Sequence, residues 1–194
     1  MKLEPTILEG GIVRLEPLEE THLQGLCDAI RNGALWTSHV TKIPQPDNID
    51  RFFDAAKKHH TNGEGIVFAT IEKSTSTVVG STRFLNTDIP AGRTEIGFTF
   101  LGKQWQKTRI NTEAKLLMLA HAFDYLKLNR VAFLTDYLND QSRRAILGLG
   151  AKQEGVLRNH IVMPSGRVRD SVIFSIIKNE WPGVKEHLLW KLAQ

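Results

Sequence analysis

The sequence of 194 residues contains one cysteine, Cys27, which excludes an internal disulfide and a metal site built from several cysteines. No run of 18 apolar residues is present, so we expect no membrane-spanning helix. Residues 1–5 lack the basic and then apolar pattern of a secretory signal peptide. These absences together favour a cytoplasmic protein.

A strong charge of one sign is also absent. The net charge is +4 and the pI is about 9.3, with the basic residues scattered along the chain. Basic residues scattered in this way do not form the dense basic patch of a nucleic-acid binder, so we expect neither a nucleic acid nor a membrane as partner. The sequence has no internal repeat, no P-loop, no dinucleotide-binding glycine pattern, no HExxH motif and no nucleophile elbow. We expect no metal site either.

What remains is the composition of an ordinary globular chain, with 41% hydrophobic and 24% charged residues. The length suits one domain over residues 1–194. Apolar and polar alternation predicts a first strand at 11–18. Six further strands are expected at 66–72, 77–85, 94–101, 130–138, 152–163 and 167–178. Helical spacing predicts helices at 19–30, 48–60, from within 104–111 to 126, at 140–149 and at about 182–193.

The order of these elements predicts the fold class. Strands that are neighbours in the sequence favour antiparallel pairing, whereas the helix between strands 94–101 and 130–138 requires a parallel crossover. We therefore predict an α/β (α+β) domain with a mixed, mostly antiparallel sheet of about seven strands and flanking helices. Positions 114–126 are mostly apolar, so this long helix should be buried against the sheet.

Residues 93–126 are the most informative stretch. A strand leads through a polar loop into the long helix, whose first N–H groups have no partner within the helix. The helix dipole adds positive potential there, and Lys107 and Arg109 add two charges. From these residues alone we predict a phosphate-bearing ligand.

Several short motifs, in order and spacing, resemble the GCN5-related N-acetyltransferases (GNAT), and within them the ribosomal-protein N-terminal acetyltransferases of the RimJ/RimL type. The motifs lie at residues 12–15, 95–98, 104–106, 111–114, 139–142 and 149–155. The resemblance implies the acyl-CoA N-acyltransferase fold, in which the strands predicted at 94–101 and 130–138 splay apart. It also implies acetyl-CoA as donor, with no metal, and a primary amine as acceptor, either a small molecule or a protein N-terminus.

The resemblance further implies a set of cofactor-binding residues on the strand, the loop and the next helix. They are Phe98, Thr99, Phe100, Gln104, Gln106, Lys107, Thr108, Arg109, Ile110, Asn111, Asn139, Ser142 and Arg143. One departure concerns the pyrophosphate loop, where the family usually has small residues, most often glycine, in place of Lys107 and Arg109. Their charges either bond the phosphates directly or, by crowding the loop, weaken CoA binding.

Four residues are candidates for proton transfer. Glu95 is the first candidate for the base, acting through water, and alternation places it on the face opposite Ile96, Phe98 and Phe100. The alternative is that the Glu95 carboxylate is solvated or paired with a neighbouring arginine. Asp136 is a second candidate for the base. Ser142 is the candidate for protonating the departing thiolate, and Tyr137 is the runner-up.

Structural roles compete with several of these assignments. Asn139, expected to bond the pantetheine amides, is also a good N-cap, and Ser142 would then occupy position N3. Arg143 and Arg144 could reach the CoA 3′-phosphate or form a solvated basic face. The substrate-binding candidates are Trp36, His39 and His160, for which plain surface or hydrogen-bonding roles are the alternatives.

The sole cysteine lies far along the chain from the cofactor loop, which argues against an acyl-cysteine intermediate and for direct attack of the amine. A non-catalytic acyl-CoA-binding or interaction module on the same fold is the alternative function. Whether the chain forms a homodimer stays open.

Overall fold

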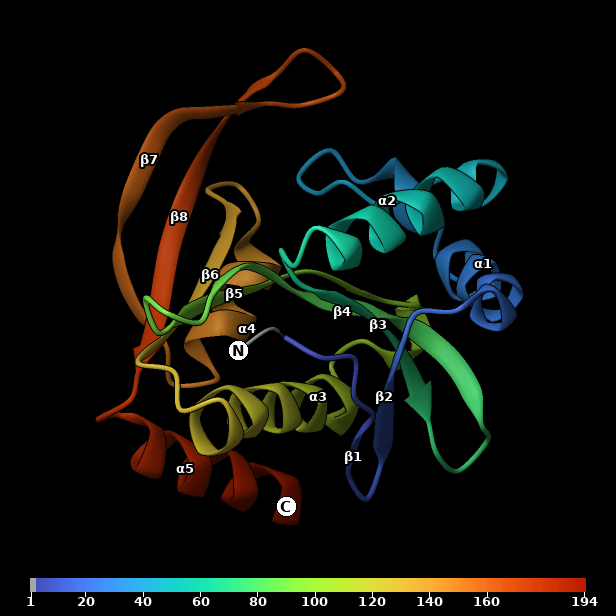
Figure 1. Cartoon of the computed structure of the whole chain (residues 1–194). Helices are drawn as coiled ribbons and strands as arrows, with labels where there is room; N and C mark the ends of the chain where they lie inside the picture. The colour runs from blue at the N-terminus through green and yellow to red at the C-terminus, as the bar shows by residue number, and fades with distance from the viewer. Residues whose placement is uncertain (1–2) are drawn as a thin grey trace.

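A computed structural model describes residues 3–194 and contains one eight-stranded sheet with helices on both faces (Figure 1). The strands are β1 (Leu8–Glu9), β2 (Val13–Pro17), β3 (Ile66–Glu72), β4 (Thr77–Asp88), β5 (Arg93–Leu101), β6 (Arg130–Asp136), β7 (Lys152–Val162) and β8 (Val168–Ile177). The helices are α1 (Leu23–Arg31), α2 (Ile49–Thr61), α3 (Arg109–Ala120), α4 (Asp140–Leu147) and α5 (Trp181–Ala193).

The strand order is β1-β2-β3-β4-β5-β6-β8-β7, and every neighbouring pair is antiparallel except β5 with β6. The predicted fold class and its single parallel crossover are therefore confirmed. The sheet has one strand more than predicted, because Leu8 and Glu9 pair with Leu15 and Arg14. Two residues are too few to show a period-2 pattern in the sequence.

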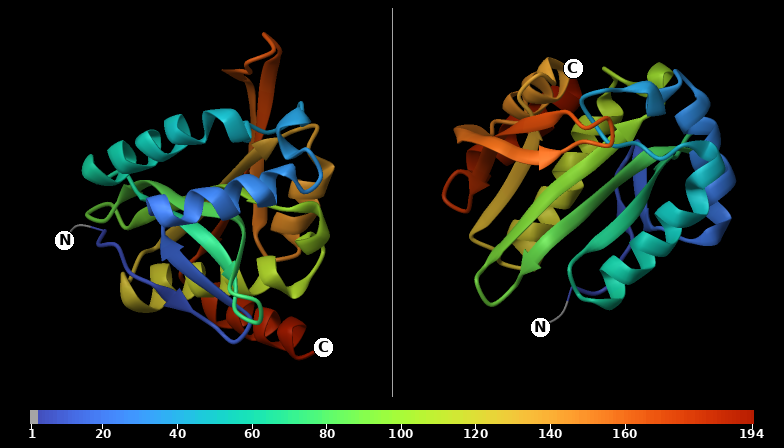
Figure 2. Two further views of the ribbon diagram at one scale, coloured as in Figure 1. Left: turned by 90° about the vertical axis from the view of Figure 1, so that its right-hand side faces the viewer. Right: turned by 90° about the horizontal axis from the view of Figure 1, so that it is seen from above.

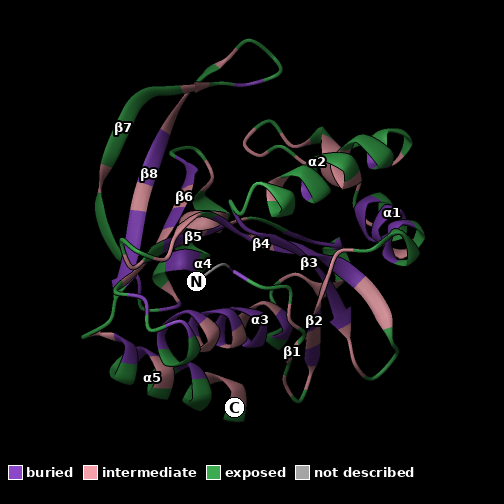
Figure 3. Cartoon of the chain, in the orientation of Figure 1, coloured by how far each residue is buried: buried purple, intermediate pink, exposed green. Residues whose placement is uncertain are grey.

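The helices divide between the two faces of the sheet. α3 and α5 lie together on one face, while α1 contacts β4 and α2 contacts β3 on the other (Figures 1 and 2). α3 continues through a π-helical segment, His121–Tyr125, and most of its side chains are buried, as Figure 3 shows. No helix within residues 3–194 has the length and apolar character needed to cross a bilayer.

Glu113 fixes the start of α3 against the N-terminal strands. Its carboxylate is only 8% exposed and accepts the backbone N–H groups of Gly11, Ile12 and Val13 at 3.0, 2.7 and 2.6 Å. A Cβ at Gly10 would lie 2.5 Å from the Glu113 carboxyl carbon, so this approach requires a glycine there. The first turn of α3, where the anion site is predicted, is thereby held in place.

Candidate functional site

The parallel strands β5 and β6 pair over only three residues. The paired positions are Arg93, Thr94 and Glu95 of β5, yet β5 continues to Leu101 and β6 to Asp136. Beyond Glu95 the two strands diverge, which confirms the predicted splay. Each strand therefore leaves backbone polar groups facing the opening, and such groups need partners.

A β-bulge bends β5 where it leaves β6. Arg83 of β4 pairs with Gly97 and Ser81 pairs with Phe100, so one residue of β4 faces both Phe98 and Thr99. Phe98 has φ of 48°, in the left-handed region that is uncommon for a residue with a side chain, and it is 47% exposed. Strained backbone of this kind often accompanies functional sites.

After the bulge, the side chains of β5 point to the face of the sheet opposite to the one that regular alternation predicts. Ile96 packs in the large core with α3, whereas Phe100 packs in the smaller core with α1 and α2, edge-on to Phe52. The prediction that Ile96, Phe98 and Phe100 share one face is therefore wrong. An inserted residue changes the parity of a strand, and simple alternation does not reveal it.

Lys115 lies beneath this bulge and was not identified from the sequence. Its side chain points from α3 to the sheet, is 4% exposed, and donates to Thr82 Oγ1 at 2.8 Å and Thr99 Oγ1 at 2.7 Å. Burial lowers the pKa of Lys115 to about 7, and no carboxylate pairs with it in the part of the chain described. The signal available was a single lysine at a core position of an apolar helix.

Glu95 lies at the closed end of the splay. It lines a cavity of about 480 Å³ together with Asn86, Ala132, Leu134 and other residues of the same face. Burial raises the pKa of Glu95, and the Asn86 amide, which donates to Oε2 at 3.1 Å, partly offsets that shift. A partly buried carboxylate with a raised pKa is suited to accept a proton.

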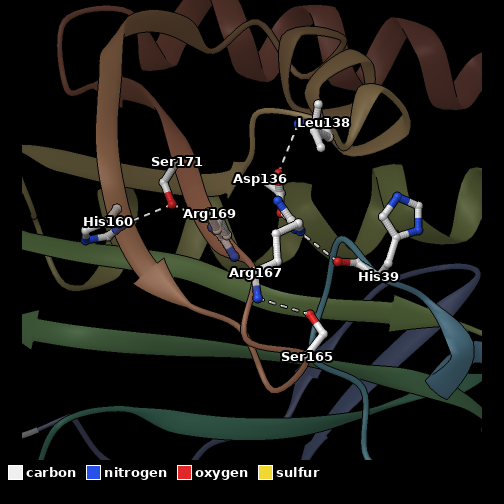
Figure 4. Close-up of polar contacts among 8 residues, drawn as sticks. All are labelled: His39, Asp136, Leu138, His160, Ser165, Arg167, Arg169 and Ser171. Atoms are coloured by element: carbon white, nitrogen blue, oxygen red, sulfur yellow. Dashed lines mark hydrogen bonds and ion pairs between the residues drawn. The ribbon is translucent and has the colours of Figure 1, made fainter.

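Asp136, the second candidate base, is engaged by other groups. Its buried carboxylate forms an ion pair with Arg167 and accepts the backbone N–H of Leu138 at 3.0 Å (Figure 4). Arg167 also donates to the backbone oxygen of His39 at 3.0 Å. This side chain therefore joins the β7–β8 turn, the end of β6 and the loop after α1, and Glu95 stays the better candidate base.

The start of α4 has the geometry predicted from its capping residues. Asn139 Oδ1 accepts the backbone N–H of Ser142 at 3.0 Å, so Asn139 is the N-cap and Ser142 is at N3. Ser142 is partly buried. Tyr137 lies just after β6, is 47% exposed and stacks against Arg143, whose Cζ is 4.9 Å from the ring centroid. Arg144 is exposed on the same helix.

In the loop before α3, a residue other than glycine adopts a left-handed backbone conformation. Lys107 has φ of 61°, the left-handed value that glycine adopts most easily, and its side chain is exposed. Thr108 is the N-cap of α3; its Oγ1 accepts from Ile110 N at 3.3 Å. The loop and helix start line a cavity of about 430 Å³ that includes Arg109. Lys107 therefore adopts a backbone conformation that glycine would adopt without strain.

Other predicted loop residues hold the loop to its surroundings. Gln104 is bonded to Asn32, at the end of α1, through both its backbone N–H and its side chain. Gln106 donates to the Leu101 backbone oxygen at 2.9 Å and accepts from Gln141 of α4 at 3.1 Å. Arg109 donates to the Leu192 backbone oxygen of α5 at 3.2 Å. Asn111 is partly buried in the first turn of α3.

The three predicted acceptor-side residues occupy different settings. Trp36 packs against the smaller core beside α1, and His39 is exposed on the following loop. His160 of β7 is exposed, and its Nδ1 is 3.0 Å from Ser171 Oγ of β8 (Figure 4). Viewed from above, β4 and β5 are seen between α2 and the β7–β8 hairpin (Figure 2). Within residues 3–194 no group of three or more His, Cys, Asp or Glu side chains could hold a metal ion.

Comparisons with known proteins agree with this geometry. The family model described as "Acetyltransferase (GNAT) domain" matches residues 13–152. A curated relative, "Uncharacterized N-acetyltransferase p20" of Bacillus licheniformis, is 31% identical over 121 residues, which are 62% of this chain and 67% of that protein. The matches to curated relatives span between 54% and 67% of those proteins.

Solved structures match over nearly the whole chain. A GCN5-related N-acetyltransferase from Brucella melitensis has a TM-score of 0.86 and 31% identity, covering 98% of this chain and 87% of that one. RimJ of Mycobacterium smegmatis has a TM-score of 0.79 and 17% identity, covering 96% and 92%, a likeness that concerns the fold alone.

Proposed function

Because this chain belongs to the GNAT acetyltransferase family and is an acyltransferase, we propose that it transfers the acetyl group of acetyl-CoA to a primary amine by direct attack. The single observation that carries the proposal is the splay of β5 from β6 beside the Phe98 bulge. An extended ligand with amide groups could bond the free backbone edges there. The structure of RimJ from Mycobacterium smegmatis is in complex with CoA-disulfide, a cofactor form that fits this proposal.

The residues present fit such a ligand. The backbone of Phe98, Thr99 and Phe100 would bond the pantetheine arm from one edge of the splay, and Asn139 would reach it from the other. The loop around Lys107 and the first turn of α3 would bind the pyrophosphate, because Thr108 satisfies only one of the free N–H groups there. When bound, acetyl-CoA supplies a thioester carbonyl that an amine can attack.

Proton transfer is assigned to residues on both sides of the splay. Glu95, held by Asn86, would accept the proton from the acceptor amine, directly or through water. Ser142 or Tyr137 would donate a proton to the leaving thiolate; their hydroxyls make no hydrogen bond within residues 3–194. Cys27 is buried in α1 with its thiol directed to the Pro46 backbone oxygen, consistent with a reaction that forms no acyl-cysteine.

Two measurements test the proposal. Acetyl-CoA should raise the melting temperature of the protein, since a ligand that binds only the folded state stabilises it. Release of free CoA thiol should then depend on an added amine, measured over small amines and N-terminal peptides. Absence of stabilisation at saturating acetyl-CoA would contradict the cofactor assignment, and stabilisation without turnover on any amine would contradict the transfer reaction.

A further inference from the structure

Arg83 of β4 is a partly buried arginine whose charge has no counter-ion within residues 3–194. Its Nε is shielded from solvent and lacks a hydrogen-bond acceptor. Burial lowers the pKa of Arg83 to about 10, and no neighbouring carboxylate offsets that shift. The side chain is still a cation at neutral pH, and a buried cation without a partner is costly.

Two aromatic rings hold the guanidinium in place. Its Cζ is 4.4 Å from the ring centroid of Phe98 and 5.3 Å from that of Phe52. Phe98 comes from the strained bulge of β5, and Phe52 comes from α2 on the same face of the sheet. An aromatic face attracts a cation, but it does not accept the hydrogen bonds that the N–H groups of a guanidinium direct in the guanidinium plane. The two terminal Nη groups of Arg83, which make no hydrogen bond within residues 3–194, are therefore oriented and still available, whereas the shielded Nε is not.

The register places Arg83 beside the candidate base. Arg83 pairs with Gly97, so Glu95, two residues earlier on β5, is its diagonal neighbour on the same face. Such diagonal neighbours have Cβ atoms about 7–8 Å apart. The preceding residue, Thr82, faces the opposite way and bonds Lys115. Arg83 and Glu95 therefore face the side of the sheet that α1 and α2 partly cover.

We propose that Arg83 binds a carboxylate of the acceptor, so that the preferred acceptor is a small amine with a carboxylate close to its amino group. This inference rests on the proposed acetyl transfer. The guanidinium fork matches a carboxylate with two parallel hydrogen bonds, and the ligand supplies the missing counter-ion. The same cation disfavours polyamines. A peptide N-terminus lacks a carboxylate at this distance unless an acidic side chain provides one.

Matched acceptors test the proposal by kinetics. Glycine, β-alanine, γ-aminobutyrate and larger α-amino acids are compared with their amides, and kcat/KM is measured for wild type, Arg83→Met and Arg83→Lys. Wild type should prefer the best acid over its amide by about 10- to 100-fold, the range expected for a charged hydrogen-bonded pair. Arg83→Met should reduce that preference to about twofold or less, and Arg83→Lys should retain part of it. Arg51→Met, at an exposed position beside Phe52 in α2, is the control and should keep the preference.

A binding measurement separates this inference from the reaction itself. The N-acetyl derivatives of the same acids and amides are titrated into the CoA-bound protein by calorimetry, which needs no turnover. Wild type should bind the acids at least about 10-fold more tightly than the amides, and Arg83→Met should not. If no amine is acetylated but this difference is found, the proposed reaction fails and the carboxylate site stands.

The overturning results are equally specific. An acid-to-amide ratio near one in wild type, or an unchanged ratio in Arg83→Met, would refute the role of Arg83. Melting temperature adds a check against a purely structural role. Replacement of an unpaired buried cation by an apolar side chain of similar length should leave the melting temperature unchanged or raise it. A large decrease in Arg83→Met would mean that Arg83 serves packing.

Discussion

Replacement of Lys115 by methionine should change how the stability of this protein depends on pH. Lys115 is buried in α3, and among residues 3–194 it bonds only to the hydroxyls of Thr82 and Thr99. Burial lowers the pKa of Lys115 to about 7. In the unfolded chain the lysine titrates near its ordinary value of about 10.4. Between these two values the unfolded state binds more protons than the folded state.

The sign and size of the pH effect on the free energy of unfolding follow from the difference between the two pKa values. Where the unfolded state binds more protons, the free energy of unfolding rises with pH. The penalty for burying the cation is therefore complete below about pH 7 and is relieved as pH rises toward 10. For one group with these two pKa values, the gain between pH 6 and pH 9 is about 2–3 kcal/mol. Methionine has no charge, so Lys115→Met lacks this contribution.

The assay is urea unfolding of wild type and Lys115→Met at several pH values from 6 to 9. The difference between the two free energies of unfolding should change by about 2–3 kcal/mol in favour of wild type over this range. The comparison removes other titrating groups and any constant packing effect, and Lys58→Met, at an exposed position of α2, is the control. A difference that stays flat with pH would refute a lowered lysine pKa.

Three further changes test other parts of the structure. Glu113→Ala removes the shared acceptor of three backbone N–H groups, of which that of Val13 is buried. It should lower the free energy of unfolding by about 3–5 kcal/mol in urea unfolding, whereas Glu186→Ala, at an exposed position, should change it by less than about 0.5 kcal/mol. Lys107→Gly relieves a left-handed residue and should stabilise the protein by about 1 kcal/mol by the same assay. If the Lys107 charge bonds phosphate, Lys107→Gly should also raise the Kd for acetyl-CoA and weaken its salt dependence, and an unchanged Kd would refute that role. Glu95→Gln should lower kcat by about 100-fold or more. In wild type, activity should fall as the pH drops through the pKa of Glu95, which burial raises above its ordinary value. A Glu95→Gln variant with wild-type kcat would exclude Glu95 as the base.

The fold was predictable where the sequence carries a long periodic signal. The apolar positions of α3 and the strand-like stretches of β3, β4 and β8 predict elements close to those observed, and one helix between two strands predicts the parallel pair. Local chemistry was equally readable at Asn139, whose side chain caps α4. These signals depend on neighbours in the sequence, so they survive without knowledge of the tertiary structure.

Features that depend on distant contacts were not predictable. The bulge at Phe98 inserts one residue into an otherwise regular alternation, and nothing in the sequence of β5 distinguishes it. Lys115 interrupts the apolar pattern of α3, but its partners Thr82 and Thr99 become known only from the tertiary structure. Arg83 likewise becomes informative only when Phe52 and Phe98 surround it and no carboxylate of residues 3–194 does.

The short pairing of β5 with β6 links the two halves of the sheet through only three positions of each strand. Past Glu95 the sheet is open between β5 and β6, with one row of backbone donors and acceptors on each side. A ligand with amides along its length would act there as a missing strand. Its binding would therefore join the β1–β5 half of the sheet to the β6–β8 half, and part of its binding free energy would appear as added stability of the whole sheet.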